Sequence, residues 1–113
     1  MKKEPARNLT EPMYYILLIL HTPNHGYGIM QKVHEFTHGR VEIGAGTLYS
    51  LLSKFTGEGL IKIDSIGERK KTYVITDKGK EVVKEEHQRL RRLVMDGEQI
   101  LKGGKRNETN GEA

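Results

Sequence analysis

The sequence of 113 residues has no cysteine, no tryptophan and only three prolines. Without cysteine the chain can form neither a disulfide nor a thiolate metal site, which is typical of a protein from a reducing compartment. No apolar run approaches the roughly 20 residues that are needed to cross a bilayer. We therefore expect a soluble cytoplasmic protein that has no membrane partner.

What the chain does contain is charge, with a modest basic excess. Lys and Arg number 19 against 15 Asp and Glu, which gives a net charge of +4 and a pI near 9.3. The excess favours phosphate or other anions as partners. A chain of this length forms one small domain, and its 35% hydrophobic content suits a core that is completed by a partner subunit.

Helix signals occur three times before residue 60. Thr10 can cap a first helix, whose residues 13–20 are apolar on all sides. A second helix is expected after "NHGYG", with Ile29, Val33 and Phe36 on one side and Gly39 at its end. The third, over residues 47–56, turns its leucines inward and points five other side chains outward: Thr47, Tyr49, Ser50, Ser53 and Lys54.

Two β-branched runs around a glycine-containing turn follow in "LIKIDSIGERKKTYVIT" and predict a hairpin. Its tip, residues 67–71, carries Arg69, Lys70 and Lys71. The fold class is therefore mostly α with a small β-hairpin. Three helices and then a hairpin is the order of a winged helix-turn-helix module, which we place at residues 9–76. Such a module puts one helix in the DNA major groove and a basic wing beside it.

The last part of the chain predicts one long helix at residues 77–101, capped by Thr76 and shallowly interrupted at Gly97. Apolar residues recur along it at spacings of three and four, as in a helix seam. Residues expected in this seam are Val83, His87, Leu90, Leu93, Val94 and Leu101. So long a stripe exceeds what a small domain can cover, and we interpret it as a dimerisation helix. Residues 1–8 and 102–113 are expected to be flexible or disordered.

The stretches "LTEPMYYILLIL…HGYGIMQKV", "GAGTLYSLLSKFTGEGLI" and "GERKKTYVITDKGKEVV" closely resemble the PadR family of transcriptional regulators, in its short subclass with a single C-terminal helix. The resemblance implies a homodimeric DNA-binding regulator, usually a repressor, whose operator is a pseudo-palindrome. It assigns Thr47, Tyr49, Ser50 and Lys54 to the recognition helix. It assigns Arg69, Lys70, Lys71 and Tyr73 to the wing.

Relatives in the family sense small molecules at the dimer interface, so the resemblance also implies a possible effector. Met13, Tyr14 and Tyr15 are the candidates to line its pocket, although aromatic residues on an apolar helix are more often plain core. No cofactor is expected.

One motif favours another function. "HEFTH" has the spelling of a zinc-protease helix, with His34 and His38 as metal ligands, Glu35 as base and Glu58 as a third ligand at a suitable distance in sequence. Helical spacing turns both histidines toward solvent, and nothing else in the chain suggests a catalytic cleft. We therefore expect no catalytic or metal site, with a zinc-dependent hydrolase and a protein-binding winged helix as the alternatives to a DNA-binding regulator.

Overall fold

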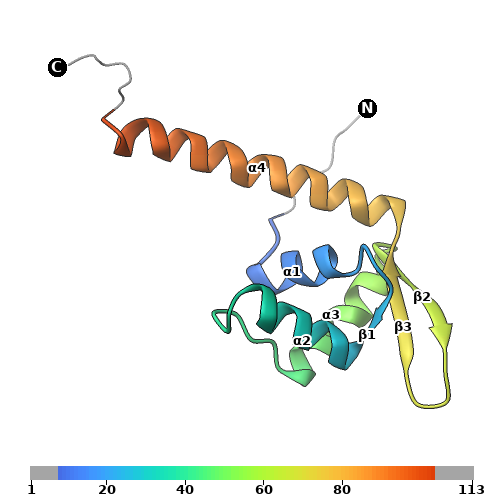
Figure 1. The fold of residues 1–113 in the computed structure, drawn as a ribbon. Coiled ribbons are helices and arrows are strands. Elements are labelled where there is room, and N and C mark those ends of the chain that lie inside the picture. The colour runs from blue at the N-terminus through green and yellow to red at the C-terminus, as the bar shows by residue number, and fades with distance from the viewer. Residues whose placement is uncertain (1–7, 104–113) are drawn as a thin grey trace, which may run out of the picture. The chain divides into compact units, whose positions relative to one another are not determined.

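A computed structural model describes residues 8–103 of the chain and shows four helices and a three-stranded antiparallel sheet in that range (Figure 1). The elements are α1 (Glu11–Ile19), β1 (Asn24–His25), α2 (Gly26–Phe36), α3 (Ala45–Gly57), β2 (Ile61–Ile66), β3 (Lys71–Ile75) and α4 (Asp77–Leu101). The chain divides into two units, one up to Val83 and one from Lys84 onward, so α4 begins in the first unit and forms the second.

Helix α1 starts where the sequence predicts. The Met13 amide donates to the Thr10 hydroxyl oxygen at 3.3 Å, and Pro12 lies in the first turn, where no helical donor is missed. Ile16 and Leu17 are completely buried. They form the centre of the first unit's core together with apolar side chains of α2, α3 and the sheet.

Helix α3 presents the expected inner face to that core. Leu48, Leu52 and Phe55 are each 1% exposed or less, and Leu51 packs beside them half-buried. Burying three large apolar side chains stabilises the fold by about 5 kcal/mol or more. The rotation of α3 about its own axis is therefore fixed.

Helix α2 corrects one prediction. Phe36 was expected beside Ile29 and Val33, which are fully buried, but it is 69% exposed. Spacing gives the direction of a side chain around the helix axis, not its position along that axis. Phe36 is the last residue of α2, whereas the residues that α2 buries, Gly26, Ile29 and Val33, lie in its earlier turns.

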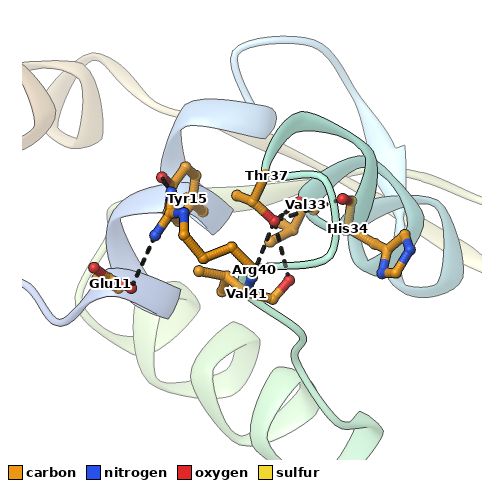
Figure 2. A network of polar contacts seen from close by, with 7 residues as sticks. All are labelled: Glu11, Tyr15, Val33, His34, Thr37, Arg40 and Val41. Carbon is orange, nitrogen blue, oxygen red and sulfur yellow. Dashed lines mark hydrogen bonds and ion pairs between the residues drawn. The ribbon is translucent and has the colours of Figure 1, made fainter.

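The segment after α2 is fixed by the buried hydroxyl of Thr37 and by contacts of Arg40 with α1 (Figure 2). The Thr37 hydroxyl donates to the Val33 carbonyl at 2.8 Å and accepts from the Val41 amide at 3.1 Å. Arg40 donates to the Tyr15 hydroxyl at 2.9 Å and lies 3.8 Å from the Glu11 carboxylate. The hydrogen bond to Tyr15, more than the charge of Glu11, raises the pKa of Arg40.

The sheet has one more strand than the sequence predicted. Its order is β1-β3-β2, and β1 pairs Asn24 with Tyr73 and His25 with Thr72. The stretch "NHGYG" predicts only the approach to a helix, because a two-residue strand has no periodicity to detect. The pairing ties the start of α2 to the hairpin.

The start of α4 is fixed to the turn between α3 and β2. Thr76 caps the helix as predicted, since its hydroxyl accepts from the Gly79 amide at 3.1 Å, and its own amide donates to the Leu60 carbonyl at 2.9 Å. A Cβ at Gly79 would collide with that same backbone carbonyl, so only glycine allows this close approach. The predicted interruption at Gly97 is wrong: α4 is one continuous helix.

Candidate nucleic-acid interface

The outward face of α3 carries small polar groups, one tyrosine and one lysine. We call Thr47, Tyr49, Ser50, Ser53 and Lys54 the outward stripe. All five are exposed, and Tyr49 is 52% exposed. The Lys54 ammonium lies 2.8 Å from the Glu58 carboxylate one turn later, where α3 ends.

Beside this helix stands the hairpin β2–β3, which we call the wing, residues 61–75 (Figure 1). The backbone closes its tip with a 2.8 Å hydrogen bond from the Gly67 amide to the Lys70 carbonyl. Arg69, Lys70 and Lys71 are exposed there with a single carboxylate, that of Glu68. The tip is therefore a concentrated positive charge.

An open hollow of about 620 Å³ joins these parts, and we call it the wing hollow. Three segments contribute to it: the end of β1 with the start of α2, one residue of α3 and the wing. Its lining is His25, Gly26, Tyr27, Tyr49, Ile66, Gly67, Glu68, Arg69, Lys70, Lys71 and Tyr73.

Tyr49 is held in place by a glycine. A Cβ on Gly26 would collide with the Tyr49 hydroxyl and ring, whose atoms are the three nearest to that position. The missing side chain at the first position of α2 therefore leaves the space that Tyr49 occupies. This contact couples the orientation of Tyr49 to the strand β1 that precedes Gly26.

The wing hollow unites five of the predicted DNA-binding residues: Tyr49, Arg69, Lys70, Lys71 and Tyr73. Thr47, Ser50, Ser53 and Lys54 lie outside it along the exposed side of α3. Sequence reasoning missed His25, Gly26, Tyr27 and Ile66. Only Ile66 gave a signal, as a large apolar residue beside a basic turn, whereas the other three depend on the pairing of β1.

The predicted dimerisation residues are divided by the structure. Val83 is 5% exposed and belongs to the core of the first unit, so it is not available to a second chain. Its spacing matches the seam, but α4 is still part of the first unit at that point. Leu90 is half-buried, and His87, Leu93, Val94 and Leu101 are exposed on the following turns.

The "HEFTH" stretch does not form the helix that a zinc protease needs. Helix α2 ends at Phe36, and His38 follows with a φ of 53°, outside helical geometry. Our placement of His38 on a helical face was therefore wrong. His34 pairs instead with Glu42 at 3.1 Å. In residues 8–103 no three histidine, aspartate or glutamate side chains gather as a metal site would require.

Three helices, an outward polar face on the third and a cationic wing beside it define a winged helix-turn-helix DNA-binding protein. A family model described as the transcriptional regulator PadR-like family matches residues 16–85, more than half of the chain. The chain belongs to this family, and it is a DNA-binding transcriptional regulator. Its membership confirms the fold class and the resemblance that the sequence suggested.

Solved structures agree with this assignment. A transcriptional regulator from Clostridium thermocellum is 28% identical, with a TM-score of 0.65 over 76% of this chain and 87% of that one. A PadR family regulator from Eggerthella lenta is 26% identical, with a TM-score of 0.62 over 78% and 75%.

Bacillus subtilis PadR in complex with operator DNA is 29% identical, with a TM-score of 0.57 over 65% of this chain and 45% of that one.

A search of curated proteins found no match. Across residues 8–103, no helix combines the length and the apolar character that spanning a membrane demands.

The contact between Gly26 and Tyr49 can be tested by a double-mutant cycle. We expect Gly26→Ala to lower the free energy of unfolding by about 1–3 kcal/mol, because the new methyl group overpacks the site. In a Tyr49→Ala background the same change should cost less than about 0.5 kcal/mol. Urea denaturation measures both.

The matched control is Gly28→Ala, where the new methyl group would meet Asn24 and His25 instead of Tyr49. Its cost should be the same with and without Tyr49. An undiminished cost of Gly26→Ala in the Tyr49→Ala background would show that Tyr49 does not fill this space.

Proposed function

We propose that the protein is a homodimeric repressor that binds a pseudo-palindromic operator, with the outward stripe in the major groove and the wing on the flanking backbone. The observation that carries the proposal is the wing hollow, in which Tyr49 of α3 and the wing cations line one open space. A duplex that reached Tyr49 would thereby meet the cations too. The Bacillus subtilis relative supports this because its structure is a complex with operator DNA.

The outward stripe suits base recognition. The major groove is about 12 Å wide and admits one α-helix. Thr47, Ser50 and Lys54 lie three and four residues apart, on one side of α3. Hydroxyls can bond either donors or acceptors on base edges, and lysine favours the acceptors of guanine. The ion pair with Glu58 must loosen before Lys54 can make that contact.

Contacts to the DNA backbone would come from the wing and from the N-terminal ends of α2 and α3. Arg69, Lys70 and Lys71 can neutralise phosphates. His25 and Gly44, the N-cap residues of α2 and α3, provide no side-chain capping hydrogen bond. The amides of the first turns, together with the positive ends of the helix dipoles, therefore suit phosphate oxygens.

Dimerisation would use the exposed apolar side chains of α4. Leu93, Val94 and Leu101 are more than half exposed, and water is a poor environment for so many large side chains on one helix. A symmetric dimer presents two α3 helices to successive major grooves, roughly 34–36 Å apart. This spacing is why we expect a pseudo-palindromic operator.

The remaining parts of the proposal concern chemistry, location and control. We propose a protein without catalytic activity that acts on DNA in the cytoplasm. Met13, Tyr14 and Tyr15, the predicted effector contacts, are half-buried and pack against the core. Arg40 already bonds the Tyr15 hydroxyl, so a small molecule that bound Tyr15 there would have to compete with it. An effector site at these residues stays a prediction.

Salt dependence tests the wing cations. Lys70→Ala should weaken operator binding and lower the slope of log affinity against log salt by about one for each protomer, because one fewer counterion is released. Lys32→Ala, which removes a lysine from α2 outside the wing hollow, is the control and should leave the slope unchanged. Fluorescence anisotropy at several salt concentrations gives both slopes. Equal slopes for the two variants would contradict phosphate contact by Lys70.

Negative charge among the apolar side chains of α4 tests the dimer. Leu90→Glu with Val94→Glu should give monomers whose operator affinity falls at least about a hundredfold, since the winged helix-turn-helix module of each protomer then binds alone. Gln88→Glu with Gln99→Glu adds the same charge on the opposite side of α4 and should leave a dimer. Sedimentation equilibrium measures the mass. A stable dimer of the first variant would contradict the assignment.

A further inference from the structure

A large apolar side chain stands among the cations of the wing. Ile66 is the last residue of β2 and is 71% exposed. Arg69, Lys70 and Lys71 follow within five residues. Single exposed apolar residues are common on proteins, so exposure alone assigns nothing to Ile66. The direction of its side chain and the residues around it do indicate a role.

A β-bulge determines the direction of Ile66. Pairing between β2 and β3 is regular through Ile63 and Tyr73, then shifts by one residue before Ser65, and Ile66 pairs with Lys71. Paired residues in an antiparallel ladder project from the same face. Ile66 therefore shares a face with Lys71 and, two residues along β3, with Tyr73.

Without the bulge Ile66 would point the other way. Side chains alternate along a strand, so a regular strand would place Ile66 on the face opposite Ile63. The extra residue, Asp64, restores Ile66 to the face of Ile63. Ser65 takes the opposite face, where its hydroxyl lies 2.8 Å from that of Thr72.

The face that Ile66 shares is the one turned toward α3. Ile66 lines the wing hollow together with Tyr49, Arg69 and Lys70. An isoleucine makes no favourable interaction with a phosphate, whereas the cations around it form ion pairs with phosphates. The bulge thus turns one apolar group into the wing hollow, among the cations of the wing.

We propose that Ile66 is an apolar wedge that enters the minor groove beside the α3 contact and partly unstacks a base step, so that the wing bends the operator. This inference rests on the proposed operator binding. The minor groove is about 6 Å wide, too narrow for a hairpin whose strands are about 4.8 Å apart before side chains are added. Only side chains of the wing can enter, and isoleucine is among those that wedge base steps.

The wedge also implies a preference in the DNA. Pyrimidine–purine steps such as TA and CA unstack more easily than other steps, and A-tracts resist bending. We expect the operator to carry such a flexible step at the position of each wing. Specificity would then arise there without a hydrogen bond to a base.

The test compares two variants of the full chain. Ile66→Ser removes the apolar group. The swap Ser65→Ile with Ile66→Ser keeps the composition but moves the isoleucine to the opposite face of the wing. Ile66→Leu is the conservative control. The probe is an operator selected from random duplexes with the wild-type protein, labelled at both ends so that energy transfer reports its bend.

We expect the first two variants to bind about tenfold more weakly and to lose most of the bend, with melting temperatures and salt slopes like those of the wild type. Ile66→Leu should keep both affinity and bend. Replacing the flexible step by an A-tract should weaken the wild type but leave Ile66→Ser unchanged, which tests the wedge from the DNA side as well.

Wild-type affinity and bend in the swap variant would overturn the proposal, and so would a wild-type complex without a bend. Weaker binding with an altered salt slope would also overturn it, because the loss would then come from displaced cations. Failure of the wild type to select any duplex would instead contradict the proposed function itself.

Discussion

The burial of Leu48, Leu52 and Phe55 is the constraint on which the proposed DNA-binding face depends. These side chains fix the rotation of α3, because turning the helix by one residue would bring polar groups into the core and expose a leucine. The outward stripe is the other side of the same helix. Its exposure is thus a consequence of core packing, and no separate interaction has to hold it.

Two glycines extend this constraint to neighbouring parts. Gly26 leaves room for Tyr49 at the start of α2, and Gly79 allows α4 to approach the Leu60 backbone. The first fixes the tyrosine of the recognition helix against β1, which pairs with the wing. The second fixes the start of α4 to the turn that follows α3. A single methyl group would therefore disturb the packing of the Tyr49 side chain on α2 in the first case and the backbone contact between the start of α4 and Leu60 in the second.

Sequence reasoning succeeded where burial is periodic. The inner face of α3, the hairpin, the Thr76 cap and the extent of α4 all follow from spacing and capping, and the cations at the wing tip follow from the turn. It failed where position along an axis or pairing between distant segments decides the outcome. Phe36 is exposed because α2 ends there, Val83 is buried because α4 still belongs to the first unit, and β1 is too short to show a pattern. The bulge that directs Ile66 is likewise a property of the paired strands.

The central claim is that α3 and the wing face the same DNA duplex. The absence of cysteine lets one introduced thiol carry an iron–EDTA cleavage reagent at Ser50→Cys, at Glu68→Cys or, as a control, at Lys32→Cys. Bound to the operator, the first should cut within each half-site, the second beside it, and the third should cut little. Weak cutting from Ser50→Cys, no stronger than that from Lys32→Cys, would contradict the account.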